Sequence, residues 1–338
     1  MRKTVVLRPS DVSGKMGNNR IKNLVLDHVI ELLLIILIVV MSIVSKNFLT
    51  VNNIMNIFRN QALKGVIAFG MTMVIISGQI DLSIGSQVAL AGVIVARFCR
   101  DLPSTGASVT AACLIGILIA LIVAVLVGAL HAFLVQKFNM PAFIVTLATL
   151  NGLYGLAGII CEGFPIANAF PAWFLQIGIG KVGVVPVPAI ILIAVFLVAH
   201  IIMTYTTTGR AVYAVGGNAE SARLSGINVF RTKIIVFAAV QCMCVLAAFM
   251  HSAQVASGSY SFGKGWEVDV ISSVVIGGTS MAGGIGKPWG TLMGVLFMGV
   301  VINAMTILNV DVYAQYIVRA PIMTFAVLMA TFQAKAKA

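Results

Sequence analysis

The chain has 338 residues, of which 60% are hydrophobic and only 9% are charged, and its formal net charge is +12. A soluble domain carries about 25% charged residues, so the composition excludes an ordinary soluble protein and indicates a polytopic membrane protein. At roughly 20 apolar residues per crossing, we expect about ten spans in one membrane domain, without a soluble catalytic domain.

The excess of basic residues fits a membrane better than nucleic acid. Lysines and arginines crowd residues 1–28, before the first apolar run, as in a cytoplasmic tail that obeys the positive-inside rule. A signal peptide is the alternative, but no small-residue cleavage site follows Val44. We expect a cytoplasmic basic tail over 1–28, a membrane domain over 29–332 and a cytoplasmic tail over 333–338.

The apolar runs predict an all-α polytopic fold. Their lengths are typical of transmembrane helices, although two of them are short. The predicted spans lie near residues 29–45, 62–77, 84–98, 108–135, 141–160, 184–204, 232–253, 267–280, 289–308 and 314–332.

The two short runs suggest an inverted five-plus-five repeat with discontinuous helices. One begins after Asp81 on the predicted inside, and the other contains Asp269 near its head on the predicted outside. Short, glycine-interrupted segments at matching places in two halves point to a transport pathway. The alternatives are helix N-capping for the aspartates and close helix packing for the glycines. The candidate translocation or hinge residues are Asp81, Ser83, Gly85, Asp269, Gly277 and Gly278.

A polar segment, residues 205–231, interrupts the apolar pattern in the second half of the chain. Within it, Asn218 is a plausible helix N-cap and Gly226 a stop, while Glu220 and Arg223 can pair on one face. A short helix here could dock a partner, or it could be an ordinary solvated loop helix. The candidate docking residues are Asn218, Ala219, Glu220, Arg223, Leu224, Ser225 and Gly226.

We expect Ala222 and Leu224 to form the less polar face of that helix. Its counterpart in the first half of the chain is the semi-polar stretch Phe48–Arg59, which follows the first span on the opposite predicted side. The two stretches would then be one inverted pair.

Motifs for chemistry are missing from the sequence. Residues 258–264 match the start of a phosphate-binding loop, but Gly265 stands where the magnesium-binding hydroxyl belongs. The four histidines and five cysteines show no metal, redox or nucleophile spacing. We therefore expect no catalytic residue, disulfide, metal or cofactor, and the sparse charge in the spans disfavours a proton-coupled carrier.

Three runs resemble signatures of the ribose-type sugar ABC transporter permeases: residues 70–86, 208–227 and 274–286. Their order and spacing match that family across about residues 30–332. Gln79 and Ser221 depart from it, because the family usually has Gly and Ala at these positions. The resemblance is to the family as a whole and does not name a sugar.

The resemblance implies a bacterial inner-membrane permease with cytoplasmic termini that works by alternating access. Its partners would be a second permease copy or sister permease, a cytoplasmic ATP-binding subunit, a periplasmic sugar-binding protein and membrane lipid, and ATP would be hydrolysed by the partner. Residues 218–226 would be the helix that couples to the ATPase, within a coupling loop over 205–231. A branched-chain amino acid permease and a stand-alone facilitator are the alternatives.

Polar residues within the apolar runs are candidates to line the sugar pathway, because sugars favour amide and aromatic partners. The alternative is hydrogen bonding between helices. The candidates are Asn151, Tyr154, Gln241 and Asn303.

Overall fold

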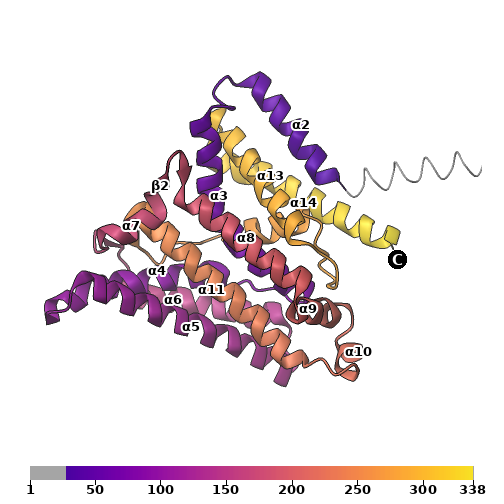
Figure 1. Cartoon of the computed structure of the whole chain (residues 1–338), viewed down its shortest axis with the longest axis horizontal. Helices are drawn as coiled ribbons and strands as arrows, with labels where there is room; N and C mark the ends of the chain where they lie inside the picture. The colour runs from indigo at the N-terminus through magenta and orange to yellow at the C-terminus, as the bar shows by residue number, and fades with distance from the viewer. Residues whose placement is uncertain (1–27, 338) are drawn as a thin grey trace, which may run out of the picture.

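The computed structural model describes residues 28–337, and this part of the chain is built from thirteen α-helices, one short 3-10 helix and two small strand pairs (Figure 1). The helices are α2 (Val29–Val44), α3 (Val51–Ile76), α4 (Ile84–Asp101), α5 (Val109–Lys137), α6 (Ala142–Ile160), α7 (Ala172–Ile179), α8 (Val187–Tyr205), α9 (Thr207–Gly217), α10 (Ala219–Leu224), α11 (Val229–Val255), α12 (Trp266–Ile276), α13 (Pro288–Ile307) and α14 (Val312–Lys337), with the 3-10 helix η1 at Leu102–Thr105.

The strands are two residues long and pair antiparallel. β1 (Ile166–Ala167) pairs with β4 (Ser257–Gly258), which ties the chain after α6 to the chain after α11. β2 (Lys181–Val182) and β3 (Val185–Pro186) form a hairpin between α7 and α8.

Every predicted span contains a helix. Five helices of the described chain, α5, α6, α8, α11 and α13, are long and apolar enough to cross a membrane. The count of ten spans and the inverted repeat stay predictions. At 1.5 Å per residue, the 11 residues of α12 extend only about 16 Å, so α12 crosses roughly half of a 30 Å hydrocarbon core.

Two stretches set apart in the sequence are helical. The semi-polar stretch Phe48–Arg59 forms the first turns of α3 from Val51 onward. The residues of the predicted tail over 333–338 continue α14 as far as Lys337, and their cytoplasmic location stays a prediction. The basic tail predicted over 1–28 lies, except for His28, outside the described residues.

The second half of α3 and most of α4 are enclosed on all sides. Every residue in 66–76 and in 84–96 is buried, as expected for helices that are apolar around their whole circumference. α11 packs against both of them and against α5. The helices α3, α4 and α11 form the centre of the main hydrophobic core.

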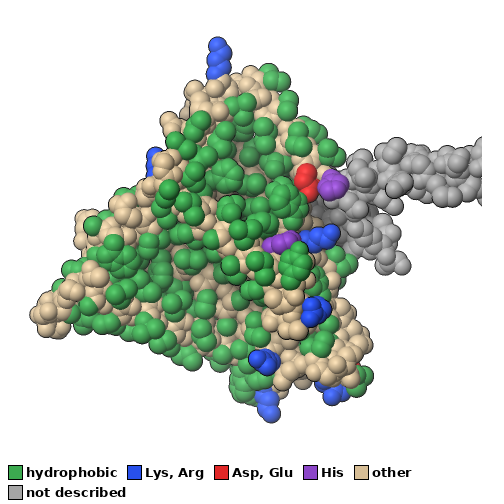
Figure 2. Space-filling view, in the orientation of Figure 1, with side chains coloured by type: hydrophobic (Ala, Val, Ile, Leu, Met, Phe, Trp, Pro, Cys, Tyr) green, Lys and Arg blue, Asp and Glu red, His purple; other side chains and the backbone are tan. Residues whose placement is uncertain are grey.

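The outer helix α5 shows how the sequence selects the membrane-facing surface. Its buried positions carry small residues at near four-residue spacing, including Ala120, Ala124 and Gly128, whereas Leu118 and Leu126 are about 60% exposed. Lipid is as apolar as leucine, so helices associate through small residues that allow close approach. A Cβ on Gly128 would lie 2.6 Å from the backbone of α11. Hydrophobic side chains accordingly cover most of the face in Figure 2, and Lys and Arg gather near α9 and α10.

Candidate functional site

The helix α4, of 18 residues, and the shorter α12, of 11 residues, begin side by side. A Cβ on Gly85, the second residue of α4, would collide with the carbonyl oxygen of Gly263, and a Cβ on Gly263 would collide with that of Gly85. Gly263 has a φ of 72°, which favours glycine. Only two residues without side chains allow this contact, which we call the half-helix junction.

The half-helix junction lies near the middle of the membrane domain. The 27 residues of α11 extend about 40 Å, close to the thickness of a bilayer with its headgroups. Gln241 is near the midpoint of α11, and its Nε2 donates to Ser83 Oγ at 2.9 Å. Gly85 follows Ser83 by two residues, so the start of α4 lies level with the middle of α11.

Asp81 is fully buried at the same depth. Its Oδ1 accepts from the backbone N–H and hydroxyl of Ser83 at 2.8 and 2.7 Å, and its Oδ2 accepts from Gln241 Nε2 at 2.7 Å. His131 Nδ1 of α5 lies 3.4 Å from the same Oδ2. We call these four residues the Asp81 cluster. The bond from Ser83 N to Asp81 Oδ1 is of the N-capping type, because the Asp81 carboxylate satisfies a backbone N–H at the start of α4; the bond from Gln241 and the approach of His131 come in addition.

Asp269, by contrast, is not an N-cap. α12 begins at Trp266, after Gly265 in a left-handed conformation, so Asp269 lies one turn inside the helix. Its Oδ2 pairs with Lys64 of α3 and lies 3.5 Å from Nη1 of Arg319 of α14. Three helices are thereby joined by one carboxylate, and the two cations compensate its burial.

The two candidate glycines after α12 have different roles. A Cβ on Gly277 would collide with the carbonyl of Gly290, so Gly277 permits close packing of α12 against α13. Gly278 has a φ of 86°, and its N–H donates to Val275 O at 2.9 Å in the turn that ends α12. Packing and turn formation, the structural alternatives for these glycines, both occur.

The short helix in the polar segment is confirmed as α10. Asn218 Oδ1 accepts from Ser221 N at 2.8 Å, and Gly226 follows the helix with a φ of 84°. Arg223 donates to both oxygens of Glu220, at 2.6 and 3.0 Å. This pair is exposed, and the Arg223 guanidinium holds the pKa of the Glu220 carboxyl below its ordinary value.

The apolar residues of α10 do not share one face. Ala222 is buried in a small cluster with Val215 and Val229, whereas Leu224 is 74% exposed. The expectation of a common face was wrong, because residues two apart lie on different sides of a helix. α10 therefore presents Leu224 to the surroundings beside its ion pair.

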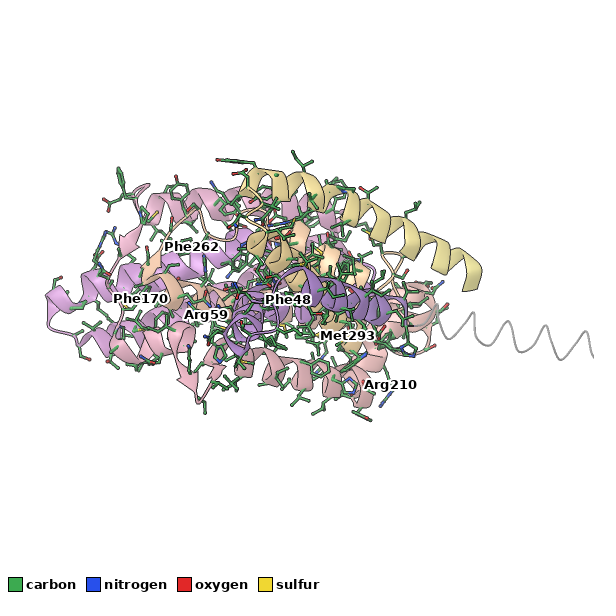
Figure 3. All side chains as sticks on the ribbon, turned by 90° about the horizontal axis from the view of Figure 1, so that it is seen from above. Phe48, Arg59, Phe170, Arg210, Phe262 and Met293 are labelled. Carbon is green, nitrogen blue, oxygen red and sulfur yellow. The ribbon has the colours of Figure 1, made fainter. Side chains whose placement is uncertain are left out.

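α9 links α10 to both half-helices. The carbonyl of Ile76, at the end of α3, accepts from Gly284 N at 2.8 Å, and Gly216 of α9 packs so tightly there that its Cβ would collide with that carbonyl. Tyr213 of α9 donates to Gly286 O at 2.8 Å. α9 thus contacts the chain before α4 and the chain after α12. In Figure 3, Arg210 of α9 lies toward one end of the molecule and Phe170 toward the other.

The pathway candidates occupy different surroundings. Asn303 exchanges two hydrogen bonds with Asn53 of α3, at 3.0 and 2.8 Å, as the structural alternative expected. Asn151 is exposed and donates to Leu147 O at 3.2 Å. Gln241 belongs to the Asp81 cluster. Only Tyr154 lies at the half-helix junction, with its hydroxyl 2.9 Å from the position that a Cβ on Gly85 would take.

The family described as the permease component of branched-chain amino acid transport systems matches residues 53–328. The ribose import permease protein RbsC of Escherichia coli (strain K12) is 38% identical over 302 residues, which cover 88% of this chain and 91% of that protein. The chain belongs to the ribose-type ABC permeases.

Other relatives agree with this assignment. RbsC of Haemophilus influenzae is 36% identical over 94% of this chain and 97% of that protein. The L-arabinose transport system permease protein AraH of Escherichia coli (strain K12) is 34% identical over 89% of each chain. No solved structure matches the chain. The permease is thus a bacterial inner-membrane protein.

Several residues of the permease's candidate site were missed in the sequence. They are His131, Glu267, Lys64 and Arg319, each of which stands in an apolar or mixed run. The partners of His131, Lys64 and Arg319 are more than 45 residues away along the chain, so no local spacing could reveal them. The available signal was the rarity of ionisable residues within spans, each of which needs a partner.

Proposed function

We propose that this chain is the translocation subunit of an ATP-driven, binding-protein-dependent importer of a monosaccharide. Two permease copies, or this chain with a sister permease, would form the membrane unit, embedded in lipid through the large apolar side chains of helices such as α5. A cytoplasmic subunit hydrolyses ATP, and a periplasmic protein delivers the sugar. The sugar permeases among the relatives and the intact coupling segment support this function.

The contacts of α9 carry the mechanistic part of the proposal. α10 docks on the ATP-binding subunit through Leu224, Glu220 and Arg223. A displacement of α10 reaches α9 directly and then the connection that precedes α4 and the connection that follows α12, because α9 contacts Ile76 and Gly286. Moving α4 and α12 relative to each other exposes the pathway to alternate sides of the membrane.

The docking step is tested by reversing the charges of α10 with Glu220→Arg and Arg223→Glu. Association with the ATP-binding subunit and sugar uptake are both measured, and we expect both to fall at least about tenfold. The matched control reverses the charges of Arg97 and Glu162, which form an ion pair with an N···O distance of 2.7 Å. This pair does not lie on α10, so its reversal should leave ATPase association unchanged. Normal association of the α10 variant would overturn the docking step.

The link through α9 is tested by Gly216→Ala. The added methyl collides with the Ile76 carbonyl, so α9 can no longer pack against the end of α3 and the chain after α12. α10 remains available for docking. We expect uptake to fall at least tenfold with ATPase association intact. Gly217→Ala is the control, since a Cβ on Gly217 meets nothing within 4 Å. Equal uptake by the two variants would contradict the mechanism.

The proposed orientation places both termini and residues 205–231 in the cytoplasm. Ser221 is exposed on α10, so Ser221→Cys in an otherwise cysteine-free permease should react with an impermeant thiol reagent only from the cytoplasmic side. Labelling in intact cells would show that residues 205–231 face the opposite side of the membrane and would overturn the proposed orientation.

Branched-chain amino acid import is the second candidate, because the matching family is described by that activity. The two candidates are separated in proteoliposomes that contain the permease and its ATP-binding subunit. Stimulation of ATP hydrolysis by a sugar-loaded binding protein supports sugar import. Stimulation only by an amino-acid-loaded binding protein would support the alternative.

A further inference from the structure

Two buried oxygens at the half-helix junction have no hydrogen-bond partner among the described residues. They are the hydroxyl of Tyr154 on α6 and Oε2 of Glu267 on α12. Each lies 2.9 Å from the position that a Cβ on Gly85 would take. The two oxygens are therefore no farther apart than twice 2.9 Å, or 5.8 Å.

Leaving these oxygens unpaired is costly. A buried polar group without a hydrogen bond costs free energy, and a carboxylate costs more than a neutral group. In the described part of the chain, no cluster of side chains is suited to hold a metal ion at this place. A ligand that brings hydrogen-bond donors would satisfy both oxygens.

Aromatic rings and cations surround the pair. Lys264 Nζ lies 5.7 Å from the ring centre of Tyr154 and 5.1 Å from that of Tyr260. The Trp266 ring, next to Glu267, lies 5.3 Å from the ring of His251, whose Nδ1 also has no partner among the described residues. Flat rings beside a carboxylate and an amine are a chemistry that matches a pyranose or furanose, with its C–H faces and its ring of hydroxyls.

We propose that Tyr154 and Glu267 hold a hydroxyl group of the transported monosaccharide at the half-helix junction. O–H···O bonds have a length of about 2.7 Å, so one sugar hydroxyl that donates to Glu267 Oε2 and accepts from the Tyr154 hydroxyl bridges two oxygens up to about 5.4 Å apart. Trp266 and Tyr260 flank the sugar ring. This inference rests on the proposed sugar-importer function, and it assigns the permease a specificity of its own, in addition to that of the binding protein.

The position of the pair makes it a transient site. α4 and α12 are in backbone contact at Gly85 and Gly263, which closes the space between them in this conformation. The sugar occupies the site when the half-helices separate, and their return to contact expels it.

The test uses the full transporter in cells, with Tyr154→Phe and Glu267→Gln as variants. Matched controls are Tyr313→Phe, whose residue is 80% exposed on α14, and Glu162→Gln, whose carboxylate is exposed in an ion pair. The probes are radiolabelled D-ribose, L-arabinose, D-xylose and D-galactose, with monodeoxy analogues of the sugar that is transported. Initial uptake rates are divided by the amount of permease in the membrane.

We expect each variant to slow uptake of the parent sugar roughly ten- to a hundredfold, the value of one hydrogen bond to a charged group or a buried partner, while both controls keep the wild-type rate. The decisive result is selectivity. For the deoxy analogue that lacks the held hydroxyl, wild type and Tyr154→Phe should transport at the same rate.

Three outcomes would overturn the inference. Equal slowing of every sugar and analogue would assign Tyr154 and Glu267 a structural role. Wild-type rates and selectivity in both variants would show that Tyr154 and Glu267 do not contact the sugar, while the proposed importer function would stand. Failure of the wild-type transporter to take up any of the sugars would overturn the proposed function together with this inference. Tyr154→Phe removes one unpartnered oxygen, so it decides the question even where Glu267→Gln does not fold.

Discussion

Replacing Asp81 is the most direct test of the cluster at the start of α4. Asp81→Leu removes the acceptor of three hydrogen bonds, two from Ser83 and one from Gln241, and leaves His131 without its carboxylate. Each orphaned buried donor costs about 1–3 kcal/mol. Gln241 and Ser83 still bond to each other at 2.9 Å, which limits the loss, and we expect about 3–5 kcal/mol. That is a large part of a total stability of about 5–15 kcal/mol.

Asp81→Asn should be far milder. The Asn carbonyl can keep both bonds from Ser83, and its NH₂ then faces Gln241. Oε1 of Gln241 has no partner within residues 28–337, so a rotation of this amide lets Oε1 accept from the Asn NH₂, in exchange for the bond that Nε2 donates to Ser83 Oγ. We expect a cost of about 1 kcal/mol, although the attraction to His131 is lost.

The free energy of unfolding is measured by reversible titration of the purified permease with denaturing detergent. Asp311→Leu is the matched control, because Asp311 is exposed and its side chain accepts only from Tyr313 N among the described groups, at the start of α14; it should cost about 1 kcal/mol, the usual cost of losing a helix N-cap. The reasoning is refuted if Asp81→Leu and Asp81→Asn unfold at the same detergent concentration, since the cluster would then depend on neither charge nor hydrogen bonding.

Three further outcomes are expected. A double-mutant cycle with Asn53→Ala and Asn303→Ala should give a coupling free energy of about 0.6–1.7 kcal/mol in the same unfolding assay, and a value near zero would dismiss this bond between α3 and α13. Gly128→Ala should destabilise by about 1–3 kcal/mol, because its methyl would overlap the backbone of α11; unchanged stability would contradict the packing. The pKa of Glu220, followed by carboxyl NMR, should lie below 4.5 and rise in Arg223→Gln. Because its folded pKa is depressed, the pair stabilises α10 fully above pH 4.5 and is lost as the pH falls through the folded value.

Local features of this chain could be predicted because their causes are local. α10 follows from a cap, a stop and a charge pair within nine residues, and all three interactions form. The apolar runs likewise located the helices, because a span must satisfy its backbone hydrogen bonds internally and face lipid with apolar side chains. Motif order and spacing were enough to indicate the family.

The errors arose where a residue has two plausible partners at different distances along the chain. An aspartate near a short helix satisfies the N-capping pattern, but Asp269 pairs instead with cations of α3 and α14, because α12 begins at Trp266 and Asp269 lies one turn inside it. Phe48–Arg59 was expected to be an interruption by its polarity, yet tertiary packing against α13 allows its asparagines to continue a helix.

By itself the sequence determined that this is a helical membrane permease with a short helix in its polar segment, because composition and short-range motifs specify solvent and local conformation. The tertiary structure alone decided that α4 and α12 begin in contact, that Asp81 meets His131 and Gln241, and that α9 contacts both connections. These features depend on glycines and isolated polar residues far apart in the chain. Such residues carry no periodic signal, and their roles appear only when close packing brings them to within hydrogen-bond distance.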